Sequence, residues 1–137
     1  MKHIESIEPI INNLNAPFWD AATRGELVLP WCAATQQFFW PPAPVSPFSL
    51  DTPITWRPAE TGGTLQAAVT YRRSYLKALD PIMPYSVGIV ELDAGPRLQV
   101  HLRDSNLALP ARHGQRVQIF FEGLLPDSRP VPMARAV

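Results

Sequence analysis

The stretch YSVGIVELDAGPRLQVHLRD, residues 85–104, decides the fold class of this chain. Apolar residues alternate with polar or small ones on both sides of Ala94-Gly95, a pattern typical of two half-buried strands joined by a short hairpin loop. Further strand patterns lie on either side of this hairpin: TLQAAVTYRRSY at 64–75, QRVQIFFEG at 115–123 and RPVPMARAV at 129–137. Five strands, the first unusually long, fit an oligonucleotide/oligosaccharide-binding (OB) barrel better than an immunoglobulin-like sandwich, which needs about seven.

Two details of these strands lead to further expectations. The alternation within residues 64–75 is interrupted in the way that a β-bulge interrupts it. The prolines of residues 129–137 favour an edge position, because proline donates no ladder hydrogen bond.

The chain before residue 61 has a different texture. Helical spacing of apolar residues, with Pro9 in the first turn, predicts a helix near the N-terminus, and a second short helix is expected from Pro17 to Gly25. Short strand patterns (ELVLPWC, QFFW and ITWRP) then surround the proline-rich stretch PPAPVSPFSL. We therefore expect a mainly β protein with N-terminal helices in residues 1–25, a ribbon-like region in 26–60 and the five-stranded barrel in 61–137.

Composition excludes several classes of protein. The 137 residues fit one main core, and the 12 basic and 12 acidic residues balance, which disfavours a purely electrostatic nucleic-acid binder. Sixteen prolines, more than twice the usual share of about 5 %, exclude a helical bundle. The longest uncharged stretch, Leu27–Leu50, contains five prolines and cannot be a membrane-spanning helix, and no secretion signal opens the chain. We expect a cytoplasmic protein that does not associate with membranes.

A spacing inside the ribbon-like region resembles that of a zinc ribbon. Cys32 and Thr35 stand at C-x2-T, and Ser46 and Ser49 follow at S-x2-S, where four cysteines would form a tetrahedral zinc site. Hydroxyl groups are poor zinc ligands compared with thiolates. The residues therefore predict no bound metal, and Cys32 is expected to be a small buried residue.

The order of several motifs is more specific than any one of them. The segments PFWDAATRGELVLPWC, QQFFWPPAPVSPFS, TGGTLQAAVTY, PYSVGIVELDAGPRLQVHL and GQRVQIFFE follow one another from Pro17 onward. This order resembles the DUF35 family of zinc-ribbon OB-fold proteins, which are associated with acyl-CoA metabolism. The resemblance implies a rubredoxin-like zinc ribbon that is degenerate here, because only one of the four ligand positions is a cysteine.

The resemblance also implies a function. Family members act beside thiolase-like enzymes, in acyltransferases, thiolases and aldolases of steroid side chains, where they help to hold acyl-CoA or complete the active site. It implies a non-catalytic subunit in a hetero-oligomer, with acyl-CoA as ligand and no tightly bound cofactor. A homodimer within the larger complex is compatible with this role. A nucleic-acid-binding OB module and a stand-alone thioester-processing enzyme are the alternatives.

Catalytic constellations are scarce. Cys32 would need a nearby histidine to act as a nucleophile, but His3, His101 and His113 fall in the tail, a strand and a turn. His101 and Asp104 project to opposite faces of a strand, so a surface histidine is the simpler interpretation.

One polar cluster fits the phosphates and adenine of CoA. Arg72, Arg73, Tyr75 and Lys77 lie where the long strand enters a loop, and Arg and Lys bind phosphates while Tyr stacks on adenine. A solvated strand end and a contact with a partner subunit are the alternatives.

The ribbon-like region is rich in aromatic residues. Trp31, Phe38, Phe39, Trp40 and Trp56 form either a local core or, in part, a docking surface, because so small a ribbon cannot bury them all. We expect Trp31, Phe38, Phe39 and Trp40 to line a partner interface or an acyl passage.

Overall fold

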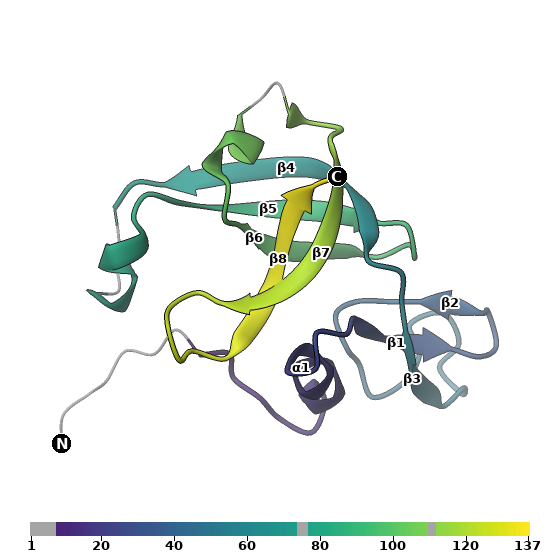
Figure 1. Cartoon of the computed structure of the whole chain (residues 1–137). Coiled ribbons are helices and arrows are strands. Elements are labelled where there is room, and N and C mark those ends of the chain that lie inside the picture. Colours follow the sequence, from purple (N-terminus) through teal and green to yellow (C-terminus); the bar gives the residue numbers. More distant parts are fainter. Residues whose placement is uncertain (1–7, 74–76, 110–111) are drawn as a thin grey trace, which may run out of the picture.

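The computed structural model describes residues 8–73, 77–109 and 112–137 (Figure 1). Within these ranges the chain is mainly β, with one α-helix and two short 3₁₀ helices. The helices are α1 (Ala16–Ala22), η1 (Lys77–Ile82) and η2 (Ser105–Ala108). The strands are β1 (Val28–Cys32), β2 (Gln37–Phe38), β3 (Ile54–Pro58), β4 (Gly62–Tyr71), β5 (Tyr85–Leu92), β6 (Arg97–Leu102), β7 (Arg116–Gly123) and β8 (Pro130–Ala136).

The five strands of the second half close into a barrel in the order β4-β5-β6-β8-β7. β4 pairs antiparallel with both β5 and β7, while β6 pairs parallel with β8 at His101–Met133 and Leu102–Ala134. The OB-fold expectation is therefore confirmed. A register shift between Leu65 and Ala67 also confirms the expected bulge in the first strand.

The expected edge position of the last strand is wrong. β8 pairs with β7 along seven residues and with β6 at two, so it lies inside the closed barrel. Pro130 and Pro132 come before the two residues that pair with β6. Their missing donors therefore do not interrupt the ladder that closes the barrel.

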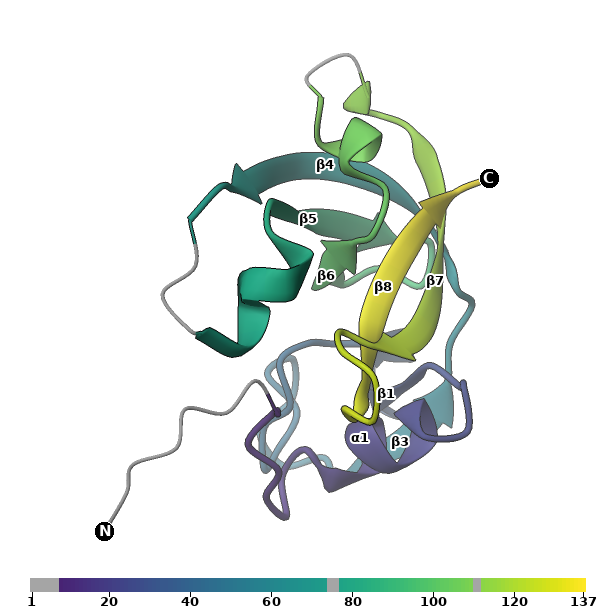
Figure 2. The same cartoon turned by 60° about the vertical axis from the view of Figure 1, so that its left-hand side comes forward.

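The first half of the chain forms a small antiparallel sheet in the order β2-β1-β3. Its strands coincide with the three short patterns expected in residues 26–60. Figures 1 and 2 show α1 and this sheet together at one end of the barrel. Phe18 of α1, Leu27 just before β1 and Leu29 within β1 share one apolar core with barrel residues such as Leu65 and Val100.

The first of the two expected N-terminal helices is not formed in the described residues 8–15. The side chain of Asn12 accepts hydrogen bonds from the backbone N–H groups of Leu14 and Asn15, and Asn15 accepts one from the N–H of Asn12. These bonds build a turn instead of a helix. The apolar spacing was misleading, because Ile10 is 86 % exposed and so belongs to no buried helix face.

No helix in the described ranges is both long and apolar enough to cross a membrane.

Candidate ligand pocket and neighbouring surfaces

A pocket of about 260 Å³ opens on the outside of the barrel between two loops. Ile82 and Pro84 of the β4–β5 connection, which contains η1, supply one wall, and Leu124 of the β7–β8 connection supplies another. The ends of β5 and β6 form its floor. The lining residues are Ile82, Pro84, Tyr85, Ser86, His101, Leu102, Arg103, Leu124 and Met133. Ligands of OB-fold proteins bind over this part of the barrel, between the corresponding loops.

His101 is half-buried at this pocket, so the expectation of a surface histidine is wrong. It points outward from β6, but the pocket-lining residues around it cover the ring. Burial, together with the nearby Arg103 guanidinium, lowers the pKa of His101 below 6.5. Its Nδ1 is buried and has no hydrogen-bond partner among the described residues. Asp104 caps η2 by accepting the N–H of Asn106.

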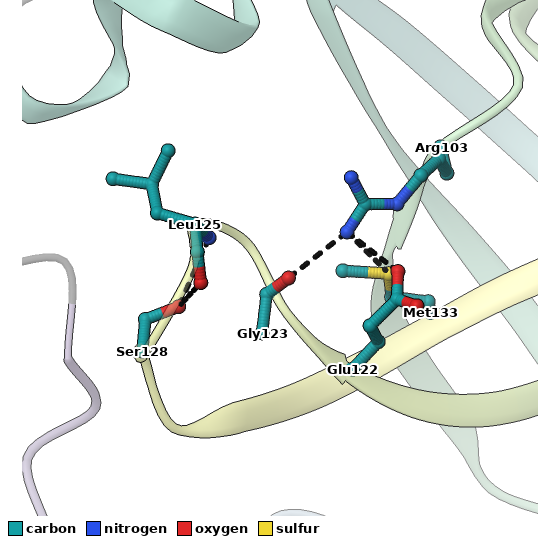
Figure 3. A network of polar contacts seen from close by, with 6 residues as sticks. All are labelled: Arg103, Glu122, Gly123, Leu125, Ser128 and Met133. Carbon is teal, nitrogen blue, oxygen red and sulfur yellow. Dashed lines mark hydrogen bonds and ion pairs between the residues drawn. The ribbon is translucent and has the colours of Figure 1, made fainter.

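Arg103 is held in place at the rim of the pocket (Figure 3). Its Nη2 lies 2.7 Å from a carboxylate oxygen of Glu122 and donates to the backbone oxygen of Gly123 at 2.9 Å. The same nitrogen lies 3.7 Å from the sulfur of Met133. In the β7–β8 loop, Ser128 bonds with the backbone N–H and oxygen of Leu125, which fixes the adjoining turn.

An aromatic row crosses the outer face of the barrel beside the pocket. The rings of Tyr71 and Tyr85 stack with centroids 5.2 Å apart, and Tyr85 lies 6.2 Å from His101. Burial and the neighbouring Tyr71 raise the pKa of Tyr85, so this phenol stays neutral at physiological pH. A shallow apolar groove of about 280 Å³ continues the row over β4 and β5, lined partly by Val69 and Ile89.

The predicted CoA-binding residues lie next to this region. Arg72 and Arg73 directly follow Tyr71 and are exposed, and Lys77 is the exposed first residue of η1. No hydrogen bond or ion pair joins these three side chains to other described residues. Tyr75 lies outside the described residues.

The structure separates Trp31 from the other three residues that were predicted to line a partner interface or an acyl passage, Phe38, Phe39 and Trp40. Trp31 packs edge-on against Phe38 and beneath the Arg57 guanidinium, and Trp40 packs against Phe18 of α1. Phe39 is only 5 % exposed. Phe38, Phe39 and Trp40 nevertheless border a hollow of about 470 Å³ that also touches Phe48 and the β5–β6 turn, whereas Trp31 and Trp56 are absent from its lining.

Three of the four positions with zinc-ribbon spacing come together through hydrogen bonds. Cys32 is fully buried, and hydrogen bonds from Ser46 and Thr35 lower its pKa to about 7, outweighing the opposite effect of burial. The buried hydroxyl of Ser46 also accepts the N–H groups of Phe48 and Ser49. The hydroxyl of Ser49 pairs with Thr52 at 2.8 Å. In the described ranges no three His, Cys, Asp or Glu residues form a group suited to a metal ion.

Sequence reasoning missed His101 and Arg103 as pocket residues. The only available signal was a histidine and an arginine two positions apart on the outer side of a strand. The walls that make this position a pocket come from residues 82–84 and from Leu124 and Met133, which are distant in the sequence.

These features define a class of protein: a five-stranded OB-fold barrel with a small three-stranded sheet and a loop-bordered pocket. Residues 56–122 match the family described as the C-terminal OB-fold domain of ChsH2. In solved structures, the chain is similar to a chain of the Ltp2-ChsH2(DUF35) aldolase, with a TM-score of 0.78 and 27 % identity over 94 % of this chain and 98 % of that one. The chain belongs to the DUF35 OB-fold family.

A curated relative is larger. The chain is 38 % identical over 101 residues to a probable enoyl-CoA hydratase alpha subunit of Thermomonospora curvata. The aligned part covers 69 % of this chain and 29 % of that protein, so the chain spans less than a third of this relative's length.

Proposed function

We propose that this chain is a non-catalytic accessory subunit that binds acyl-CoA and completes or stabilises the active site of a thiolase-like enzyme. The acyltransferase, thiolase and side-chain aldolase types are all compatible with this role. The observation that carries the proposal is the structural match over nearly the full length of a chain of the Ltp2-ChsH2(DUF35) aldolase. The name of the Thermomonospora curvata relative, an alpha subunit of an enoyl-CoA enzyme, also supports a role as a subunit of an acyl-CoA enzyme.

The chemistry of the described residues supports a non-catalytic role. Cys32, the single cysteine, is fully buried and bonds with hydroxyl groups, so it meets neither substrate nor an imidazole base. His101 is kept neutral by burial, but among the described residues no carboxylate bonds with its buried Nδ1 to orient it as a general base. The reactive groups of the complex are therefore assigned to the partner.

The acyl-CoA assignment is supported by exposed cations beside a pocket. Arg72, Arg73 and Lys77 are free of other described side chains, and their loop leads to the pocket wall at Ile82. Arginine can bind phosphate oxygens with paired hydrogen bonds, and lysine acts as a point charge. We assign the CoA phosphates to this loop, which also carries Tyr75.

The partner surface is assigned to the aromatic side of the small sheet. Aromatic and other apolar residues make up most of the hollow bordered by Phe38, Trp40 and Phe48, and Phe48 is 48 % exposed. Aromatic residues are enriched where subunits meet. In this proposal Trp31 and Phe39 support the surface, and the small sheet is a degenerate zinc ribbon that holds no metal.

Charge reversal tests the acyl-CoA assignment. In the complex with its thiolase-like partner, Arg72→Glu with Arg73→Glu should raise the KM for acyl-CoA several-fold while leaving the free energy of unfolding within about 0.5 kcal/mol, because both side chains are exposed. Arg112→Glu, at another exposed loop arginine, is the control. Unchanged KM in the double variant would contradict the assignment.

A further inference from the structure

The pocket beside His101 has walls suited to a small apolar group. Its volume of about 260 Å³ lies just below the 300–1,000 Å³ typical of sites for drug-sized ligands. Most of its walls are hydrocarbon or thioether, from Ile82, Pro84, Leu102, Leu124 and Met133. A compact ligand that is mainly apolar would replace water there with favourable contacts.

The polar side of the pocket offers hydrogen-bond donors that are already positioned. Arg103 uses Nη2 for its contacts with Glu122, Gly123 and Met133. Its Nη1 and Nε make no hydrogen bond to a described residue, and Figure 3 shows the second terminal nitrogen with no dashed line. Because the guanidinium is planar and its Nη2 makes three contacts, the remaining donors need less reordering than those of an uncontacted arginine to bind an oxygen acceptor.

The charge balance of the pocket distinguishes between possible acceptors. The Glu122 carboxylate lies 2.7 Å from the Arg103 guanidinium and offsets its charge. Burial holds His101 in its neutral form at physiological pH. A second carboxylate would lose its hydration and meet Glu122 nearby, whereas an uncharged carbonyl oxygen would accept the same hydrogen bonds at a smaller desolvation cost.

We propose that this pocket binds the carbonyl end of a short, uncharged, mainly apolar group, with Arg103 as the hydrogen-bond donor and Leu124 and Met133 as walls. A ketone, an amide and a thioester share this chemistry. Identifying the group with the acyl part of acyl-CoA rests on the proposed function, but the preference of the pocket for an uncharged carbonyl does not.

NMR titration of the isolated full chain tests the proposal without any partner. The probes are 2-hexanone, hexanamide and hexanoate, which have similar chains and differ in the oxygen group. We expect the two uncharged carbonyl compounds to shift the resonances of His101, Leu124 and Met133 with saturation, and hexanoate to bind at least about tenfold more weakly, because its charge must be desolvated. Equal or tighter binding of hexanoate, or no saturable shift with either carbonyl compound, would overturn the proposal.

Two variants localise the site. Leu124→Trp places a larger side chain in the wall and should abolish saturable binding of 2-hexanone, while Arg103→Lys keeps the charge but loses the planar donors and should weaken binding several-fold. Arg97→Lys, at an exposed arginine on the same strand, is the matched control and should bind as the wild type does. Wild-type affinity in both pocket variants, with their folded spectra intact, would place any binding elsewhere and refute the assignment. If either variant fails to fold, the comparison of the three probes on the wild-type chain still tests the proposal.

Failure here and failure of the proposed function are distinguishable. A chain that forms an active complex with its thiolase-like partner but ignores all three probes refutes only the pocket assignment. A chain that binds the carbonyl probes but forms no complex refutes only the accessory-subunit role.

Discussion

His101 shows how an outward-facing strand residue becomes partly buried. It points away from the barrel core, yet the pocket formed with Tyr85 and Met133 covers part of its ring. Burial disfavours the imidazolium, and the positive charge of Arg103 acts in the same direction. The residue is therefore uncharged at neutral pH, and its protonation destabilises the folded state.

The pH dependence of His101 follows from this shift. Its pKa lies below 6.5 in the folded state, so as the pH falls through 6.5 the unfolded state binds the proton first and stability is lost. NMR titration should give a His101 midpoint below 6.5 in the folded chain and near 6.5 in the chain unfolded by urea. In the same pH range, His101→Gln should lose less free energy of unfolding than the wild type. A folded midpoint at or above 6.5 would contradict this account of the pocket.

Ser46 illustrates how a turn with the spacing of a zinc-binding turn can be held by a hydroxyl group. Its oxygen accepts two backbone N–H groups of the turn, and its proton is available to the thiol of Cys32. These bonds satisfy polar groups that would otherwise be buried without partners. Side-chain packing, including Phe39 against Phe48, completes the loop.

We predict that the purified chain holds far less than one zinc ion per molecule. Elemental analysis of protein prepared without chelator measures this directly. The variant Thr35→Cys, Ser46→Cys, Ser49→Cys restores four thiolates at the zinc-ribbon spacing and should take up about one zinc ion, because thiolates bind zinc far better than hydroxyls do. Stoichiometric zinc in the wild type would refute the prediction.

At the scale of elements, the barrel depends on β4 pairing with two neighbours. Gly63 faces Leu92 of β5 and Val117 of β7, so the strands approach closely at this position. A Cβ there would lie 2.5 Å from a methyl group of Val90 and 2.8 Å from the backbone oxygen of Glu91. The glycine is needed for close approach.

Gly63→Ala should therefore destabilise the chain by about 2 kcal/mol, the usual effect of overpacking a tight core. Urea unfolding measures the change. Gln66→Ala, at an exposed position of the same strand, should change stability by no more than about 0.5 kcal/mol. Equal stability of the two variants would mean that the barrel does not close tightly at Gly63.

The elements also show what the sequence can and cannot predict. The strands were predicted within a few residues, because alternation survives wherever one face of a strand is buried. The helix expected near the N-terminus was wrong in the described residues 8–15, because side-chain bonds of Asn12 and Asn15 compete with the backbone. The edge position of β8 was wrong, because its pairing with β6 brings together residues about 30 positions apart. The pocket was missed for the same reason, because its walls come from residues far apart in the sequence.

At the scale of the whole molecule, balanced charge separates this chain from OB-fold proteins that bind nucleic acids. With 12 basic and 12 acidic residues, the whole chain has no net positive charge to release counterions from phosphates. We predict negligible binding of single-stranded DNA or RNA at physiological salt, measured by fluorescence anisotropy with a labelled oligonucleotide. Sub-micromolar binding with a steep salt dependence would favour a nucleic-acid-binding role instead.

The central claim, that the chain serves a thiolase-like enzyme as an accessory subunit, is tested most directly by reconstitution. The chain and a thiolase-like protein from the same organism are co-expressed, and the purified product is weighed by native mass spectrometry and assayed with acyl-CoA, together with each protein alone. The account predicts a hetero-oligomer of fixed stoichiometry, no turnover by this chain alone, and higher activity of the complex than of the partner alone. Separate elution of the two proteins, or turnover of acyl-CoA by this chain on its own, would contradict it.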